Sequence, residues 1–326
     1  MKGLFGIIVL SCWMVGMAVP SPAAEEAEKY PGKPVTMNHA FAAGGSTDMV
    51  ARAIAAVAPK YFSQPIIIVP KPGGSGLVSL QALASARPDG YTLHFARTGD
   101  MTTGPIIEEI PIDVEKEFTP LGQVGMDREI IAVHTKAPWK TVEEFIADAK
   151  KEPGKIKFAT SGVATGARFA FEKFCSVVGI KLTCVPFKGN APSTIAVAGG
   201  HIPVFVGGVN EALPHVQRGD MRVIITLAEK RVKEYPDSPA ATEKGWDATM
   251  GVWHAVFARR AVPPAILSRL EEVFKKVVHD PDYISAMYKM GAEPLYLSGK
   301  DFFEYWRRER KWVAETAKVL GLKKEQ

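Results

Sequence analysis

The sequence predicts an α/β protein with two domains, and three observations support this fold class. Short apolar segments alternate with segments of helical periodicity along nearly the whole chain, which is typical of parallel or mixed sheets flanked by helices. The 326 residues exceed what a single hydrophobic core usually organises. A glycine-rich junction between a strand and a helix also occurs twice, about 120 residues apart. We therefore expect two α/β units with mixed sheets.

The expected elements follow from these patterns. The strands are apolar runs delimited by turn residues, at 35–40, 66–70, 91–96, 130–134, 156–161, 182–186, 203–206, 221–226 and 253–257. The helices have apolar residues at helical spacing, at 47–62, 77–86, 141–151, 165–178, 190–198, 210–218, 264–279 and 300–320. Two start signals are visible: Thr141 with Glu144 has the capping-box pattern, and Pro263-Pro264 opens the following helix.

Residues 1–24 have the pattern of a secretory signal peptide. Lys2 precedes the apolar run LFGIIVLSCWMVGMAV, and the short, mostly small-residue segment PSPAA follows it. The run is shorter than the roughly 20 residues that a membrane-spanning helix needs. We expect cleavage after Ala23 or Ala24 and export to the periplasm, with no second membrane segment in the remaining chain.

Charge and cysteine content exclude several classes of site. The net charge of +5 falls to +4 without residues 1–24, which contain Lys2 and no acid. The basic residues at 307–311 interleave with apolar ones at helical spacing, which indicates an amphipathic helix rather than a nucleic-acid site. No CxxC or HxxxH spacing points to a metal. Cys175 and Cys184 are close enough in sequence to form a disulfide in an oxidising compartment, but the sequence leaves this open.

The two glycine-rich junctions are the strongest candidate ligand sites. FAAGGSTD (41–48) and ATSGVATG (159–166) each join an apolar strand to a helix. The first turn of a helix has unpaired N–H groups and a partial positive charge, so it favours anions. If the two junctions face each other across a cleft, they would hold a carboxylate or a phosphate between them.

Other motifs do not support nucleotide binding or catalysis. GGSGLVS (73–79) lacks the third glycine of a dinucleotide fingerprint, and no P-loop sequence occurs. Ser161 has alanine, not glycine, two residues before it, so the GxSxG elbow of serine hydrolases is absent. We expect no enzymatic activity and no cofactor.

Several short motifs, in a fixed order, resemble the extracytoplasmic solute receptors of tripartite tricarboxylate transporters (TctC), also called Bug proteins. The motifs are FAAGGSTD (41–48), KPGGSGL (71–77), PDGYTL (88–93), ATSG (159–162), VPFKGNAP (185–192), ALPH (212–215) and PDSPAATEKG (236–245). The resemblance extends over roughly 30–323. It implies a type II-like periplasmic-binding-protein fold whose domains, 30–127 plus 252–326 and 128–251, are joined by a hinge.

The resemblance also implies a function. Such receptors bind a small organic carboxylate between their domains and deliver it to membrane permease subunits, and a monomer is the expected state. The implied ligand contacts are Phe41, Gly44, Gly45, Ser46, Thr47 and Asp48 in the first loop, and Ser161, Gly162, Val163, Ala164 and Thr165 in the second. Asp48 is an unusual residue beside an anion. We interpret it first as a cap on its own helix, and second as a contact to the ligand through an ordered water. Phe41 either packs on the ligand or belongs to the core.

Departures from the family pattern suggest the ligand class. Arg168 stands where relatives often have histidine, and it either grips a second carboxylate or lies on the helix surface. Arg97 and His254 lie near ligand-contact positions and would add positive charge. Gly207-Gly208 replaces a frequent Asp-Asn pair, which would remove a negative charge and enlarge the pocket. These features predict a bulky or aromatic mono- or dicarboxylate rather than an amino acid.

Two alternative functions remain at this point. The closed protein could present itself to a membrane sensor kinase instead of a permease, with identical binding chemistry. An exported enzyme is the third reading, although no nucleophile–base pair or metal spacing supports it.

Overall fold

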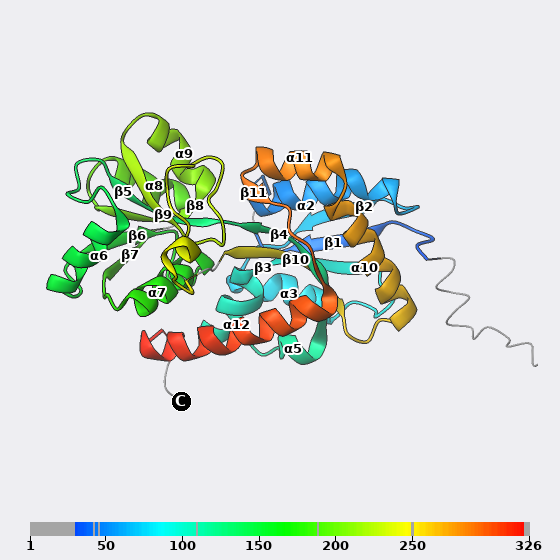
Figure 1. The fold of residues 1–326 in the computed structure, drawn as a ribbon. Helices are drawn as coiled ribbons and strands as arrows, with labels where there is room; N and C mark the ends of the chain where they lie inside the picture. Colours follow the sequence, from blue (N-terminus) through cyan, green and yellow to red (C-terminus); the bar gives the residue numbers. More distant parts are fainter. Residues whose placement is uncertain are drawn as a thin grey trace, which may run out of the picture.

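The computed structural model describes residues 30–322, except Ala42, Gly45, Glu109, Lys188, Thr249 and Met250. It contains two α/β units, each built around its own mixed sheet (Figure 1). The expected fold class is therefore confirmed. The expected signal peptide lies outside the described residues.

The first sheet has the strand order β11-β4-β10-β3-β1-β2, with β12 also paired to β4. Strands β1, β2 and β3 are parallel, whereas β10 runs antiparallel to both β3 and β4. The bounds are β1 Val35–His39, β2 Ile66–Pro70, β3 Thr92–Arg97, β4 Phe118–Asp127, β10 Val252–Arg259, β11 Ala292–Glu293 and β12 Leu297–Ser298.

The second sheet has the order β7-β6-β8-β5-β9. Strand β6 is parallel to β7 and β8, and β5 is antiparallel to β8 and β9. The bounds are β5 Glu129–His134, β6 Lys157–Thr160, β7 Thr183–Pro186, β8 Val204–Gly208 and β9 Met221–Thr226.

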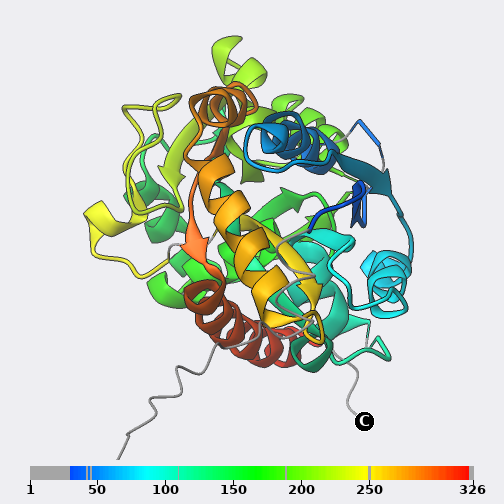
Figure 2. The ribbon, with the colours of Figure 1, turned by 90° about the vertical axis from the view of Figure 1, so that its right-hand side faces the viewer.

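Helices cover both sheets, and each one expected from the sequence is present. In the first unit they are α2 Ser46–Val57, α3 Leu77–Ala84, α4 Gly104–Ile107, α5 Val114–Glu117, α10 Pro264–Val278, α11 Pro281–Lys289 and α12 Gly299–Val319. In the second unit they are α6 Val142–Lys151, α7 Gly166–Val178, α8 Asn190–Ala198 and α9 Val209–Gln217. The turned view shows α2 beside α11 at one edge of the first unit and α12 at the opposite edge (Figure 2).

The local start signals act as the sequence indicates. Thr141 accepts a hydrogen bond from the Glu144 N–H at 3.2 Å, and the Glu144 side chain accepts from the Thr141 N–H, which completes the capping box. Helix α10 begins at Pro264, where a missing N–H costs no helical hydrogen bond.

Strand β4 was not predicted, because Pro120, Gly122 and Gly125 interrupt its apolar pattern. The strand is nevertheless central, since it pairs with β10, β11 and β12. Its pairing with β10 has two register shifts, and Gly122 adopts a φ of 141°. Glycine relieves the strain that other residues would have there.

The chain passes from the first sheet to the second where β4 ends at Asp127 and β5 begins at Glu129. It returns through the segment between β9 and β10. Helix α12 lies along both units: Phe302 and Trp306 pack in the core beneath β10, whereas Val313 and Ala317 pack in the core of the second unit.

Two further expectations concern the cysteines and the membrane. Cys175 is buried on α7 and Cys184 is half-buried on β7, and both are free thiols, so the possible disulfide is absent. Within the described part of the chain, no helix is both long and apolar enough to cross a membrane.

Candidate functional site

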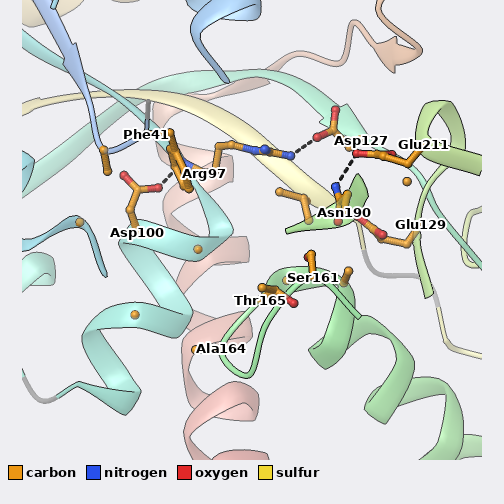
Figure 3. A pocket seen from close by; sticks show the side chains of 18 of the residues that line it. Phe41, Arg97, Asp100, Asp127, Glu129, Ser161, Ala164, Thr165, Asn190 and Glu211 are labelled. Carbon is orange, nitrogen blue, oxygen red and sulfur yellow. Dashed lines mark hydrogen bonds and ion pairs between the residues drawn. The ribbon is translucent and has the colours of Figure 1, made fainter. Parts of the chain in front are cut away.

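A cavity of about 380 Å³ lies between the two units. Residues from both sheets and from the loops between them surround it (Figure 3). The lining residues are Ala40, Phe41, Gly73, Gly76, Arg97, Gly99, Asp100, Gly104, Asp127, Glu129, Ser161, Ala164, Thr165, Gly166, Ala167, Asn190, Gly208, Glu211 and Val252.

The second predicted loop forms one wall of this cavity. Ser161, Ala164 and Thr165 line it, and so do Gly166 and Ala167 in the first turn of α7. The Thr165 hydroxyl caps α7 by accepting from the Arg168 N–H. The N–H groups of this first turn have no partner within the helix, so they present hydrogen-bond donors and a partial positive charge at the wall.

Contacts beyond the loop fix its shape. The Thr103 hydroxyl, from the first unit, donates to the Ala164 carbonyl at 2.8 Å. The Arg168 guanidinium donates to the Val163 carbonyl at 3.0 Å and lies 3.6 Å from the Glu172 carboxylate. Arg168 therefore positions the loop and does not line the cavity, and the structure does not place it for a grip on a second ligand carboxylate.

The first predicted loop contributes less than expected. Phe41 lines the cavity, and its ring lies 6.0 Å from the Arg97 guanidinium carbon. Gly44, Ser46 and Thr47 are not lining residues, and Ser46 and Thr47 instead accept hydrogen bonds from Arg97. Gly45 lies outside the described residues. Gly162 and Val163 of the second loop do not line the cavity either.

Asp48 supports the first loop from beneath. Its buried carboxylate accepts from the Gly44 N–H at 2.9 Å and from Arg52 at 2.8 Å, and it lies 3.0 Å from His39 Nε2. The hydrogen bond from Arg52, more than that from Gly44, holds the pKa of Asp48 well below its usual range. The carboxylate thus holds the loop that precedes its helix, rather than capping an N–H group of the helix, and it does not line the cavity.

We expect Asp48→Asn to lower the free energy of unfolding by about 1–3 kcal/mol at pH 7, because the amide cannot accept from all three donors. A lowered pKa in the folded state means that the carboxylate stabilises the fold above about pH 4, and that this contribution is lost as the pH falls further. The difference from wild type should therefore shrink below pH 4. Urea unfolding at pH 7 and pH 3 measures the difference in the free energy of unfolding between wild type and variant. An equal difference at both pH values would contradict a stabilising role for the ionised Asp48 carboxylate.

Arg97, Asp127 and His254 form an ionic cluster on neighbouring strands of the first sheet. Arg97 on β3 pairs in register with His254 on β10, and both side chains reach the Asp127 carboxylate at the end of β4. Burial opposes ionisation of Asp127, but the charges of His254 and Arg97 outweigh it and lower the pKa of Asp127 to about 2. Arg97 is therefore paired with an acid within the wall, and the fully buried His254 contacts Asp127 rather than the cavity.

Glu129 and Glu211 form a second acidic group beside this cluster. Glu129 begins β5 and pairs directly with Gly208 on β8. A Cβ atom at Gly208 would collide with the Glu211 carboxylate, so the missing side chain leaves room for this group. Side chains of directly paired residues lie on the same face of a sheet. The carboxyl groups of Glu129 and Glu211 therefore lie next to each other (Figure 3).

This arrangement corrects the interpretation of Gly207-Gly208. A Cβ atom at Gly207 would lie 2.5 Å from the Phe205 ring, so this glycine faces the core and does not enlarge the cavity. Gly208 lines the cavity, but Glu211 restores a negative charge in front of it. The physical argument for a bulky or aromatic ligand, which rested on lost charge and added space, does not hold.

The acidic lining residues were not predicted from the sequence. Glu129 follows the unpredicted end of β4, although an acid beside the apolar run IIAV was a usable signal. Glu211 lies in the first turn of α9. Acids are common in the first turn of helices, so nothing in the sequence distinguished Glu211 as a cavity residue. Asp100 and Asp127 belong to segments with irregular patterns, and Asn190 lies in a motif whose role was not assigned.

The family model for the tripartite tricarboxylate transporter family receptor (TctC) matches residues 50–321. A curated relative, the UPF0065 protein in the gbd 5′ region of Cupriavidus necator, is 30% identical over 94% of this chain and 93% of its own length. The suspected membership is therefore confirmed.

Two solved structures are similar over nearly their whole length. A TctC solute-binding protein from Polaromonas, without ligand, has 27% identity and a TM-score of 0.78, covering 88% of this chain and 98% of that one. Rpa4515 from R. palustris, with adipate, has 25% identity and a TM-score of 0.74, covering 90% and 98%.

Receptors of this family are periplasmic, and the similar proteins are solute-binding proteins rather than enzymes. Because the family model covers most of the chain and the fold agrees over 88% of it, this chain belongs to the tripartite tricarboxylate transporter family of solute receptors.

Proposed function

We propose that this protein captures a small organic carboxylate in the cavity between its two units and delivers it to the permease subunits of a tripartite transporter. The observation that carries this proposal is the convergence of helix starts on the cavity. Helices α7, α8 and α9 begin at Gly166, Asn190 and Val209, and Gly166, Asn190 and the α9 cap residue Gly208 line it. Glu211 lies in the first turn of α9, and its carboxylate accepts from Asn190 at the start of α8. The first turn of α7 contains no acid, so it is the helix start that favours a bound anion.

The proposed carboxylate contact is the wall made by the second loop and the first turn of α7. Backbone N–H groups at Gly166 and Ala167, with the Ser161 hydroxyl, would donate to the ligand oxygens. The adipate in the similar R. palustris protein is consistent with a carboxylate as the bound group. Cleavage after Ala23 or Ala24 would release the receptor into the periplasm, where it would act as a monomer.

Capture would involve closure of the two units about the connections between them. We propose 30–127 plus 252–326 and 128–251 as the moving bodies, with the hinge at Arg128 and near Gly251. The tail of α12 belongs to the first body in sequence but packs in the second core, so it would bend or slide during closure.

A thermal-shift screen of the protein lacking residues 1–24 tests the proposal. The panel contains aliphatic di- and tricarboxylates, aromatic acids and amino acids, with the corresponding neutral amides as controls. Binding at a hundredfold excess over Kd stabilises the folded state by about 2.7 kcal/mol, which raises Tm measurably. A rise confined to carboxylates supports the proposal. Equal rises with the amides, or no rise with any acid, would contradict it.

A further inference from the structure

The cavity contains more negative charge than a simple carboxylate site requires. Among its described lining residues, Arg97 is the one cation, whereas Asp100, Asp127, Glu129 and Glu211 are acids. Arg97 is committed to Asp127, and Asp100 lies 2.6 Å from His94 Nε2. Glu129 and Glu211 form no ion pair in the part of the chain that the structure describes, and the charge of Arg97 only partly offsets their burial.

Glu129 is the decisive residue because it is both buried and incompletely satisfied. It is only 3% exposed, it lines the cavity, and its Oε2 atom has no hydrogen-bond partner among the described residues. A buried carboxylate oxygen without a donor is unfavourable by itself. Such an atom at a cavity wall is available to a donor on a bound ligand.

Glu211 complements Glu129 from the facing helix. Its Oε1 atom accepts from the Asn190 amide at 2.5 Å, which orients the carboxyl group over Gly208. Burial, and then the charge of Glu211, raise the pKa of Glu129 well above its usual range. Burial, and then the charge of Asp127, raise the pKa of Glu211. Two neighbouring carboxyl groups that cannot both ionise easily would be relieved by a positive charge between them.

Resting on the proposed carboxylate receptor function, we propose that the ligand is an amino-carboxylate. Its carboxylate lies at the α7 wall, and its protonated nitrogen donates to Glu129 Oε2 and to the Glu211 carboxylate. A metal cation is not the favoured occupant, since no three His, Cys, Asp or Glu side chains in the described ranges are placed to hold one. This proposal replaces the prediction from the sequence that the ligand is not an amino acid.

The first test compares matched ligands by isothermal titration calorimetry of the wild-type protein lacking residues 1–24. The probes are amino acids of two to six carbons with the amino group at each position, their desamino analogues, and the dicarboxylates of equal length. We expect one amino acid to bind about 10- to 100-fold more tightly than its desamino analogue, the usual effect of a charge-assisted hydrogen bond. Equal or tighter binding of the desamino acid overturns the inference.

The second test uses the variants Glu129→Gln and Glu211→Gln, with Glu272→Gln on the exposed face of α10 as the matched control. Each cavity variant should weaken the amino acid about 10- to 100-fold and its desamino analogue less than about threefold. The control should change neither. Equal losses of affinity for both ligands would mean that the two glutamates do not recognise the amino group.

Proton exchange separates this inference from the underlying receptor function. At pH 6, in buffers of different ionisation enthalpy, a cationic group that pairs with Glu129 should release protons from the site. A dicarboxylate that binds without releasing protons, and that outcompetes every amino acid, would show Glu129 acting as a neutral donor. That result overturns the inference but leaves the carboxylate receptor intact, whereas an absence of binding by all probes contradicts both.

Discussion

Replacing Glu309 by alanine is expected to lower the free energy of unfolding by about 3–5 kcal/mol. This buried carboxyl group on α12 accepts from the Trp253 indole at 2.7 Å and from the Thr102 hydroxyl at 3.0 Å, both at Oε2. The Trp306 indole donates in turn to Thr102. Removal of the acceptor leaves buried donors unpaired and creates a cavity, and these costs add. Urea unfolding of both proteins at pH 6 measures the difference.

Glu309→Gln is the matched control, because it keeps the acceptor oxygen and the volume. Burial raises the pKa of Glu309 to about 7. A carboxyl group with a raised pKa in the folded state destabilises the fold progressively as the pH increases from about 4.5 to 7. The glutamine variant should therefore match wild type near pH 5 and exceed it by about 3 kcal/mol at pH 8. Two results would refute this account. One is a decrease in the free energy of unfolding below about 1 kcal/mol for the alanine variant. The other is a difference in the free energy of unfolding between the glutamine variant and wild type that does not depend on pH.

A methyl group at Gly166 should weaken ligand binding about 10- to 100-fold without unfolding the protein. A Cβ atom at this first residue of α7 would lie 2.7 Å from Val252 Cγ2 and 3.3 Å from Thr98 Cβ. Both neighbours belong to the first unit, so the added group wedges the two units apart at the cavity. The fold of each unit should be retained, because the nearest atoms to the added Cβ, in Val252 and Thr98, belong to the opposite unit rather than to the core around α7. Calorimetry with the strongest carboxylate from the screen measures the loss of affinity.

A compensating substitution distinguishes a wedge from a lost ligand contact. Val252→Ala removes the methyl groups that Gly166→Ala would strike, so the double variant should regain most of the affinity. Small-angle scattering with saturating ligand should show a larger radius of gyration for Gly166→Ala than for the double variant. If Val252→Ala brings no recovery, the contact between the units is not what limits binding.

Much of the fold was predictable from local patterns. The nine expected strands and eight expected helices are present, since alternation of apolar and polar residues depends on neighbours in sequence. Strand β4 was missed because its glycines and Pro120 resemble a loop, and long-range pairing with β10 stabilises it regardless. The strands β11 and β12 have two residues each, too few to show an alternating pattern, and both pair with β4.

The site was predictable only in part. The second loop lines the cavity as expected, because a strand followed by glycine, a capping threonine and a helix is readable in ATSGVATG. The sequence leaves Arg168 between a ligand contact and the helix surface and places His254 near the ligand, yet Arg168 contacts its own loop and His254 contacts Asp127. The position of a residue in the sequence does not show which group its long side chain contacts in the folded protein.

The sequence by itself determined the α/β class, the two strand–loop–helix junctions and the family, because each depends on motifs of a few consecutive residues. Only the tertiary structure decided the charge of the cavity. Glu129 and Glu211 are 82 positions apart and come together through the pairing of β5 with β8. Arg97 loses its free charge through Asp127, on a strand that reaches it across β10. Electrostatic interactions depend on distance and burial, which arise only when the chain has folded.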